Sequence, residues 1–249
     1  MKEVIIDKLE QIEKDNDVTI LYAIESGSRA WGHYNDDSDY DIRFIYKHND
    51  LNHYLTINNQ SEVIESNDGL LDIVGWDIKK ALYLHYKSNP NLREWINSPI
   101  KYVTDDEDIF RDLPDFNKGV LKHHYYGLAY RHYKKYLKGK EEFNLKYVKK
   151  MLYTIRCTLA WNVLDNDSYP SMNLDELLEE NDLSKDIKDN IIKLRDSYST
   201  LEITLNEEER ILLYDWIVDS LEKMKKDNSP VKNKRDINLY NKRFQELVR

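Results

Sequence analysis

Two aspartates separated by a single residue follow a glycine–serine turn near the start of the chain. Residues 27–43 read GSRAWGHYNDDSDYDIR. In an extended strand, side chains at positions i and i+2 lie on the same face, so Asp39, Asp41 and Arg43 point the same way. Two neighbouring carboxylates repel each other, and a divalent cation between them offsets the repulsion. The pattern therefore predicts a Mg²⁺ site, with Mn²⁺ as an alternative ion.

The turn before these aspartates has the chemistry of a phosphate site. Gly27 allows the backbone to approach a phosphate, Ser28 offers a hydroxyl, and a helix start presents free N–H groups to anions. Arg29 and Arg43 are candidates for charge-assisted hydrogen bonds to the same phosphates. Together these residues suit phosphoryl or nucleotidyl transfer, in which positioning and charge neutralisation supply most of the catalysis. The segment lacks the lysine of a P-loop, which excludes a P-loop ATPase.

A Gly-Ser pair alone is a weak signal, and so is an Asp-x-Asp pair. The Asp-x-Asp pattern also occurs in acidic loops beside an edge strand that have no catalytic role. Here a buried strand, Gly27-Ser28, a loop of ten residues and Asp39-x-Asp41 occur in order. This combination resembles the signature of the DNA polymerase β nucleotidyltransferase superfamily. The resemblance implies a nucleoside triphosphate substrate, catalytic metal ions and a palm-like mixed sheet.

The resemblance also implies a third carboxylate on a neighbouring strand. The segment LDIVGWD over residues 71–77 offers two candidates, Asp72 and Asp77. We favour Asp72, at the beginning of the expected strand, because Asp77 already suits the N-cap of the following helix. In two-metal transfer the third carboxylate would hold the catalytic ion and serve as general base for the acceptor hydroxyl.

Further segments, residues 72–82, 88–99 and 149–156, resemble one branch of that superfamily, the predicted bacterial and phage nucleotidyltransferases linked with RNA repair. Within the last segment, Lys149, Tyr153 and Arg156 fall on one stripe of a helix together with Lys146. Such a stripe suits binding of a triphosphate or stacking against a base. Its alternative is an ordinary solvated helix face.

The hydrophobic periodicity predicts an α+β fold: an N-terminal nucleotidyltransferase domain with a mixed sheet and helices, followed by an all-α helical bundle. Strands are expected at residues 18–24, 39–46, 62–65 and 70–76, with helices at 3–14, 78–86 and 92–96. After residue 114 helical spacing dominates, at 117–137, 145–164, 174–179, 185–197, 206–225 and 237–248. The expected domains are 1–114, catalytic, and 115–249, which would complete the nucleotide pocket and recognise the acceptor.

Composition limits the class of protein. The 249 residues are 41% hydrophobic and 33% charged, without an apolar run long enough to span a membrane. The N-terminus lacks signal-peptide features and the single cysteine, Cys157, cannot form an internal disulfide, so we expect a cytoplasmic protein. The net charge of −9 argues against non-specific nucleic-acid binding by the whole surface.

The expected function is transfer of a nucleoside monophosphate from a nucleoside triphosphate to an acceptor, with release of pyrophosphate. The sequence leaves three classes of acceptor open: an RNA end, a small molecule such as an aminoglycoside, and a protein. The basic stretch from Lys223 to Arg243 favours RNA, whereas the acidic net charge favours a cationic small molecule. The alternative function is a nucleotide-binding regulatory module without turnover, such as a toxin–antitoxin component.

Overall fold

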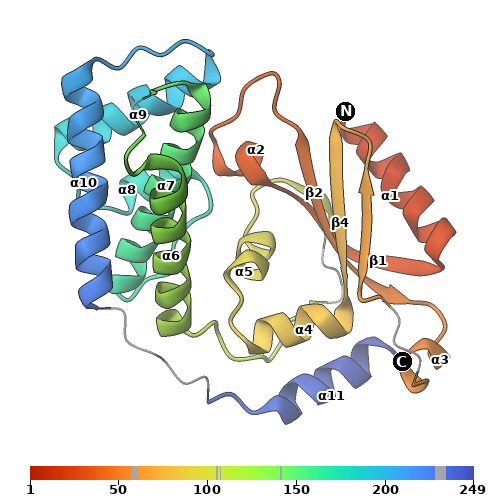
Figure 1. The fold of residues 1–249 in the computed structure, drawn as a ribbon. Coiled ribbons are helices and arrows are strands. Elements are labelled where there is room, and N and C mark those ends of the chain that lie inside the picture. The colour runs from red at the N-terminus through yellow and green to blue at the C-terminus, as the bar shows by residue number, and fades with distance from the viewer. Residues whose placement is uncertain (58–60, 105, 107, 141, 228–233) are drawn as a thin grey trace. The chain divides into compact units, whose positions relative to one another are not determined.

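The computed structural model describes residues 1–57, 61–104, 106, 108–140, 142–227 and 234–249, and they form two compact units (Figure 1). The first unit comprises Met1–Gly27, Asp39–Phe116 and Lys234–Arg249. The second comprises Ser28–Ser38 and Asn117–Asn233. The backbone therefore passes from one unit to the other inside the segment that carries the predicted chemistry.

The first unit is built on a mixed sheet, which over the described residues has five strands in the order β3-β4-β2-β1-β5. The central pair, β2 and β4, is parallel, and the other pairs are antiparallel. The strands are β1 (Val18–Ser26), β2 (Tyr40–His48), β3 (Val63–Asn67), β4 (Leu71–Asp77) and β5 (Lys101–Val103). This confirms the predicted mixed sheet.

Helices cover both faces of this sheet (Figure 1). On one face α1 (Lys2–Asn16) buries Ile5, Leu9 and Ile12 against β1, β2 and β4. The opposite face packs against α4 (Ile78–Tyr86), α5 (Pro90–Ile96) and α11 (Ile237–Leu247). The spacing of the apolar residues in α1 explains its position, because one stripe of an amphipathic helix must be removed from water.

A close approach of backbone and ring fixes the pairing of the parallel strands. Gly75 of β4 lies opposite Phe44 of β2, and a Cβ atom on Gly75 would lie 2.1 Å from the Phe44 ring. The glycine makes room for the ring, so a shift of register would cause a clash. The same register places Asp41 opposite Asp72.

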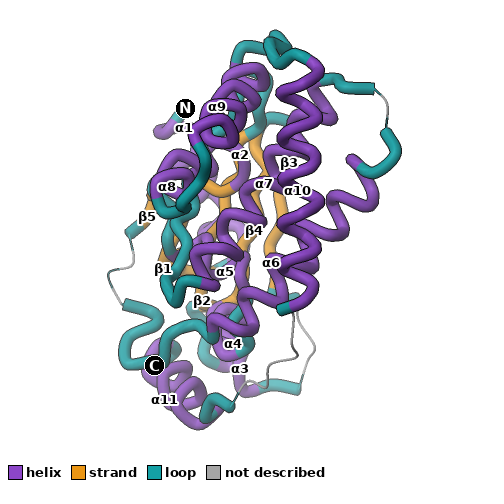
Figure 2. The backbone as a smooth tube through the Cα atoms, turned by 90° about the vertical axis from the view of Figure 1, so that its left-hand side faces the viewer, coloured by secondary structure: helices purple, strands orange, loops and turns teal. Residues whose placement is uncertain are grey.

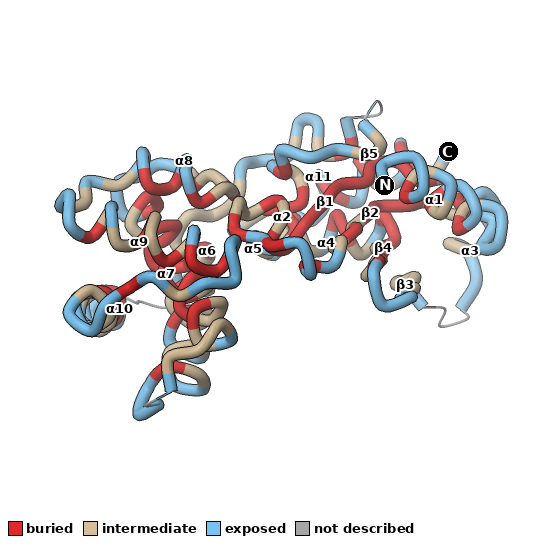
Figure 3. The backbone as a smooth tube through the Cα atoms, turned by 90° about the horizontal axis from the view of Figure 1, so that it is seen from above, coloured by how far each residue is buried: buried red, intermediate tan, exposed pale blue. Residues whose placement is uncertain are grey.

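The second unit is helical over its described residues (Figure 2). Its longest helix is α7 (Leu145–Asp165), of which 13 of 21 residues are buried, so it forms the centre of the packing (Figure 3). Around it are α6 (Lys118–His132), the π-helix η1 (Tyr133–Leu137), α8 (Leu174–Glu179), α9 (Lys185–Ser199) and α10 (Glu207–Lys226). The short α2 (Gly27–Trp31) begins at the last residue of the first unit.

Polar residues determine where these helices begin. The side chain of the residue before each helix accepts a backbone N–H bond at Asn117, Asn144, Asn173, Ser184 and Asn206. Such caps satisfy amide groups that lack a partner within the helix. The all-α second part predicted from the periodicity is confirmed. No helix of the described residues is long and apolar enough to cross a bilayer.

The grouping of segments differs from the expected ranges of 1–114 and 115–249. Residues 28–38 belong with the helical unit, and α11 belongs with the sheet. The apolar stripe of α11 explains its place, because Tyr240 and Leu247 are buried in the core that contains α4 and α5. Two short elements, α3 (Asn52–Leu55) and β5, lack a periodic signal in the sequence and were not expected. Residues 228–233 of the C-terminal basic stretch lie outside the described residues.

Candidate active site

Two of the predicted carboxylates lie side by side at the start of the parallel strand pair. Asp41 of β2 is in register with Asp72 of β4, so their side chains share one face of the sheet. One guanidinium nitrogen of Arg43 donates to both, at 2.9 Å to Asp41 and 2.8 Å to Asp72. Asp39 precedes β2 by one residue and is exposed. The arrangement concentrates acidic oxygen atoms at one edge of the sheet.

The second terminal nitrogen of Arg43 fixes the orientation of the guanidinium. It donates to the backbone carbonyl oxygens of Asp72, at 2.7 Å, and of Ile42, at 3.0 Å. The side chain therefore neutralises part of the charge of the carboxylate pair and connects β2 to β4. A contact of Arg43 with phosphate, as predicted from the sequence, stays a prediction.

Gly27 makes room for the side chain of Asp41. Its φ angle is +62°, in the left-handed region that favours glycine, and a Cβ atom would lie 1.7 Å from Asp41 Oδ2. Any larger residue must displace the carboxylate. The glycine of the Gly-Ser turn is therefore needed for the position of Asp41 as well as for approach to a phosphate.

If Asp41 binds a catalytic metal ion, as the sequence predicts, we expect Gly27→Ala to lower nucleotidyl transfer by about 100-fold, because the methyl group displaces the Asp41 carboxylate. Gly69→Ala is the matched control. Gly69 also has a positive φ, +92°, but the space around its Cβ position is open within 4 Å. Both variants should lose roughly 1–3 kcal/mol of stability to backbone strain. Transfer assays and urea unfolding of both proteins check this, and equal activity of the two variants would contradict it.

Glu25 is a buried acid that the sequence reasoning missed. One carboxylate oxygen accepts the backbone N–H of Asp41 at 2.7 Å, and the other accepts the hydroxyl of Tyr102 at 2.5 Å. The residue is 1% exposed. It holds the backbone of Asp41 at the start of β2. The available signal was an acidic residue in an otherwise apolar strand.

The residues that directly follow Gly27, Ser28–Ser38, belong to the second unit. The hydroxyl oxygen of Ser28 is buried and has no hydrogen-bond partner among the described residues. Arg29 donates to the carbonyl oxygen of Ser38 at 2.8 Å, and its guanidinium lies 5.0 Å from the centre of the Tyr34 ring. Arg29 thus connects the two ends of the loop that leads to Asp39.

The predicted stripe on α7 forms a cluster of cations and aromatic rings within the second unit. The guanidinium of Arg156 lies 4.1 Å from the centre of the Trp31 ring and is buried. Tyr153 stacks on His132 at 3.9 Å between ring centres and contacts the Trp31 ring edge-on. This packing gives Arg156 a structural task.

A second cation of the stripe, Lys149, is half-buried, with its Nζ 5.8 Å from the centre of the Tyr198 ring. Burial, followed by the charges of Arg156 and Lys149, lowers the pKa of His33 to about 3, so this histidine is neutral. The predicted nucleotide contacts of Lys149, Tyr153 and Arg156 stay predictions.

Asp77, the alternative third carboxylate, lies at the opposite end of β4. It pairs in register with Tyr46, five residues beyond Asp72, which corresponds to roughly 16 Å along a strand. Its oxygens accept the backbone N–H of Lys79 at 2.7 Å and the hydroxyl of Tyr54 at 2.9 Å. The structure therefore brings Asp72, and not Asp77, beside Asp41.

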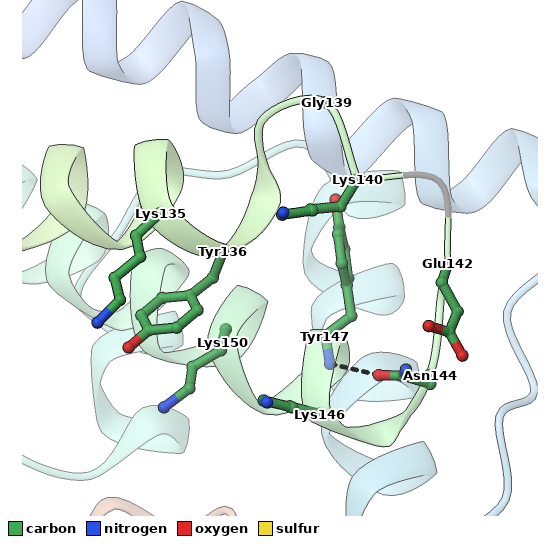
Figure 4. Close-up of a pocket in the computed structure, with 9 residues that line it drawn as sticks. All are labelled: Lys135, Tyr136, Gly139, Lys140, Glu142, Asn144, Lys146, Tyr147 and Lys150. Atoms are coloured by element: carbon green, nitrogen blue, oxygen red, sulfur yellow. Dashed lines mark hydrogen bonds between the residues drawn. The ribbon is translucent and has the colours of Figure 1, made fainter.

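The second unit also contains a pocket of about 520 Å³ with a basic lining (Figure 4). Its lysines are Lys135, Lys140, Lys146 and Lys150. The ring of Tyr136 lies between Lys135 and Lys150, each of whose Nζ atoms is 4.9 Å from the ring centre (Figure 4). Residues 134–150 contain seven lysines and two glutamates, whereas the whole chain has a net charge of −9. The lining therefore carries a local positive charge on a protein that is acidic as a whole.

A mixed sheet with paired carboxylates beside a Gly-Ser turn, followed by a helical part, is the arrangement expected of polymerase β-like nucleotidyltransferases. Comparison with known proteins agrees. Residues 1–246 match the model of the RlaP family, described as the RNA repair pathway DNA polymerase beta family, and the chain belongs to this family. Membership supports a nucleotidyltransferase type of function.

Two individual proteins are similar to the chain. The uncharacterized protein YcgL of Bacillus subtilis (strain 168) is 41% identical over 186 residues, which is 72% of this chain and 70% of YcgL. The chain is also similar to a nucleotidyltransferase-like protein from Exiguobacterium sibiricum 255-15, for which a crystal structure is known. The match covers 98% of this chain and 79% of the other chain, with 9% sequence identity and a TM-score of 0.37.

Proposed function

We propose that the protein transfers a nucleoside monophosphate from a nucleoside triphosphate to an acceptor hydroxyl, with release of pyrophosphate. The observation that supports this most directly is the pairing of Asp41 with Asp72 on adjacent parallel strands, held by Arg43. Two acidic side chains placed this close are unfavourable unless a cation is present. The single positive charge of Arg43 offsets one of the two negative charges, and a divalent cation would offset the remainder.

The donor set fits Mg²⁺, because carboxylate oxygens are its preferred protein ligands and substrate phosphates complete the coordination. We propose that Asp39, Asp41 and Asp72 hold two such ions. When bound, the ions would neutralise the transferring phosphate and lower the pKa of the acceptor hydroxyl. Arg43 would keep the carboxylates paired before substrate binds.

The remaining steps use the residues of the chain. Gly27 and Ser28 are proposed to bind the β- and γ-phosphates through the backbone and the buried hydroxyl. Asp72 would accept the proton of the acceptor hydroxyl as that oxygen attacks the α-phosphorus. The bond from the α-phosphorus to the bridging oxygen breaks, and pyrophosphate leaves with that oxygen.

An RNA end is the proposed acceptor. Lysines attract phosphates, and the half-buried ring of Tyr136 offers a surface on which a base can stack, so the pocket of Figure 4 suits a single-stranded nucleic acid. The same lysines would repel a cationic aminoglycoside. The family description, which refers to an RNA repair pathway, agrees with this choice.

Transfer is tested by incubating the protein with Mg²⁺ and each α-labelled nucleoside triphosphate, offering cellular RNA and a small-molecule extract separately as acceptors. Label should appear in the RNA and disappear with Asp39→Asn. Label in the small-molecule fraction alone would keep the transferase and overturn the RNA acceptor.

A non-catalytic regulatory module is the second candidate, because the ion pairs of Arg43 with Asp41 and Asp72 can also stabilise a site without metal. The same experiment separates the two functions. Magnesium-dependent binding of the triphosphate without transfer to any acceptor would favour the regulatory module.

We expect the double variant Lys146→Glu/Lys150→Glu, which reverses two charges of the pocket lining, to weaken binding of single-stranded RNA by at least about 10-fold at low salt. The slope of log affinity against log salt should fall by roughly 0.7 for each phosphate contact removed. Fluorescence anisotropy at several salt concentrations measures both quantities. Lys225→Glu/Lys226→Glu carries the same charge change on exposed residues of α10. A larger loss of RNA affinity in that variant would show that RNA binds at the C-terminal basic stretch and not at the pocket.

A further inference from the structure

A second group of metal-ligating side chains lies at the far ends of the parallel strands. His48 ends β2, Asp77 ends β4, and His53 lies on α3, a few residues after β2. Each offers one ligand atom, and these three atoms all lie within 4.8 Å of one another. The group is in the first unit and is separated from Asp41 and Asp72 by most of the length of the strands.

Two features of this group are unusual for side chains that only pack. The Nε2 atom of His48 is buried and has no hydrogen-bond partner among the described residues. Asp77 is 2% exposed, and over the described part of the chain it forms no ion pair with a lysine or arginine. A cation would compensate the buried charge and use the unpartnered nitrogen.

Tyr54 forms hydrogen bonds with the ends of both β2 and β4. Its hydroxyl donates to Asp77 Oδ2 at 2.9 Å and accepts the backbone N–H of His48 at 3.0 Å. The ring of Tyr54 packs edge-on against Phe244 of α11, at 5.2 Å between ring centres. Hydrogen bonds of this kind orient the ligands of metal sites and hold carboxylates in position.

We propose that His48, His53 and Asp77 bind one divalent transition-metal ion of the zinc class. Two imidazoles and a carboxylate are ligands that Zn²⁺ prefers, and a water molecule would complete four-coordination. Mg²⁺ does not suit this group, because it prefers oxygen ligands.

In the structure the two imidazole rings stack, with 3.4 Å between centres and 17° between planes. Binding requires them to turn until both nitrogens face the ion. His53 is half-buried on a helix of four residues, so its ring can turn without disturbing the core.

The consequence is a cross-link that holds residues 48–55 to the end of β4. The ion would act on stability rather than on transfer, since it lies at the opposite end of β2 and β4 from the proposed catalytic carboxylates. The proposal is therefore independent of the proposed function.

The test is titration of the metal-free full chain with Co²⁺, whose visible absorption is much stronger in four-coordinate than in six-coordinate sites. We expect one strongly absorbing Co²⁺ per chain, displaced by Zn²⁺. His53→Gln should weaken binding by at least about 100-fold, and Tyr54→Phe by about 10-fold. His123→Gln, an exposed histidine of α6, should bind as the wild type does.

Two further measurements separate the alternatives. Asp41→Asn should retain the absorption, which shows that the ion does not occupy the carboxylate site. Added Zn²⁺ should raise the melting temperature of the wild type and leave that of His53→Gln unchanged. Equal absorption in the wild type and His53→Gln, or no strong absorption in folded wild type, would overturn the proposal.

Discussion

Asp41→Asn is expected to reduce nucleotidyl transfer by about 10³-fold while leaving the fold intact. The amide has the shape of the carboxylate but not its charge, so in the proposed mechanism it would bind a divalent cation poorly and would no longer stabilise the charge on the transferring phosphate. Folding should tolerate the change, because Asp41 is partly exposed and its removal relieves the repulsion with Asp72.

Single-turnover assays at saturating Mg²⁺ and triphosphate measure this effect, with circular dichroism and thermal melting as checks of folding. Asp36→Asn is the matched control, since Asp36 is an exposed acid of the loop that leads to Asp39. It removes the same charge from the same segment. If Asp36→Asn and Asp41→Asn retained equal activity, the carboxylates of β2 would have no catalytic role.

The sequence predicted the parts of the fold that depend on local periodicity. The helix over residues 78–86 was expected with the bounds that the structure has, because its apolar spacing begins directly after a capping aspartate. The strand that carries Asp41 was also expected, since alternating apolar and polar residues are typical of a half-buried strand. Periodicity contains this information because secondary structure arranges neighbouring residues in a fixed way.

Contacts between distant segments could not be predicted in the same way. Glu25 and Tyr102 are 77 residues apart, and only the pairing of β1 with its neighbours brings the acid to the backbone of Asp41. The place of α11 depends equally on tertiary packing, because its apolar stripe would suit any hydrophobic surface. Patterns along the chain specify which face is apolar, but not its partner.

Side-chain interactions within the candidate site could not be predicted from the sequence either. Arg43 was assigned to phosphate because a cation beside a Gly-Ser turn suits an anion, and in the structure the parallel pairing of β2 and β4 directs it to Asp41 and Asp72. The need for glycine at position 27 has a comparable origin. It depends on where the Asp41 side chain lies, which only the fold determines.

The choice between Asp72 and Asp77 leads to opposite expectations for the two substitutions. Asp72→Asn should lower transfer by about 10³-fold, as Asp41→Asn does, with little change in stability, because Asp72 is partly exposed at the start of its strand. Asp77→Ala removes a helix cap and a hydrogen bond to Tyr54. Its expected effect is a loss of about 2 kcal/mol of stability with turnover per folded molecule retained.

Measuring transfer and urea unfolding on both variants in the presence of a zinc chelator checks these expectations, since the chelator excludes any contribution of an ion bound by Asp77. The opposite effects expected of the two substitutions follow from the register of β2 and β4. That register places Asp72 beside Asp41 and directs Asp77 to the far end of the strand, where its oxygens already accept the N–H of Lys79 and the hydroxyl of Tyr54. If Asp77→Ala lost turnover at unchanged stability, the catalytic carboxylates would have to lie at that end of the sheet instead.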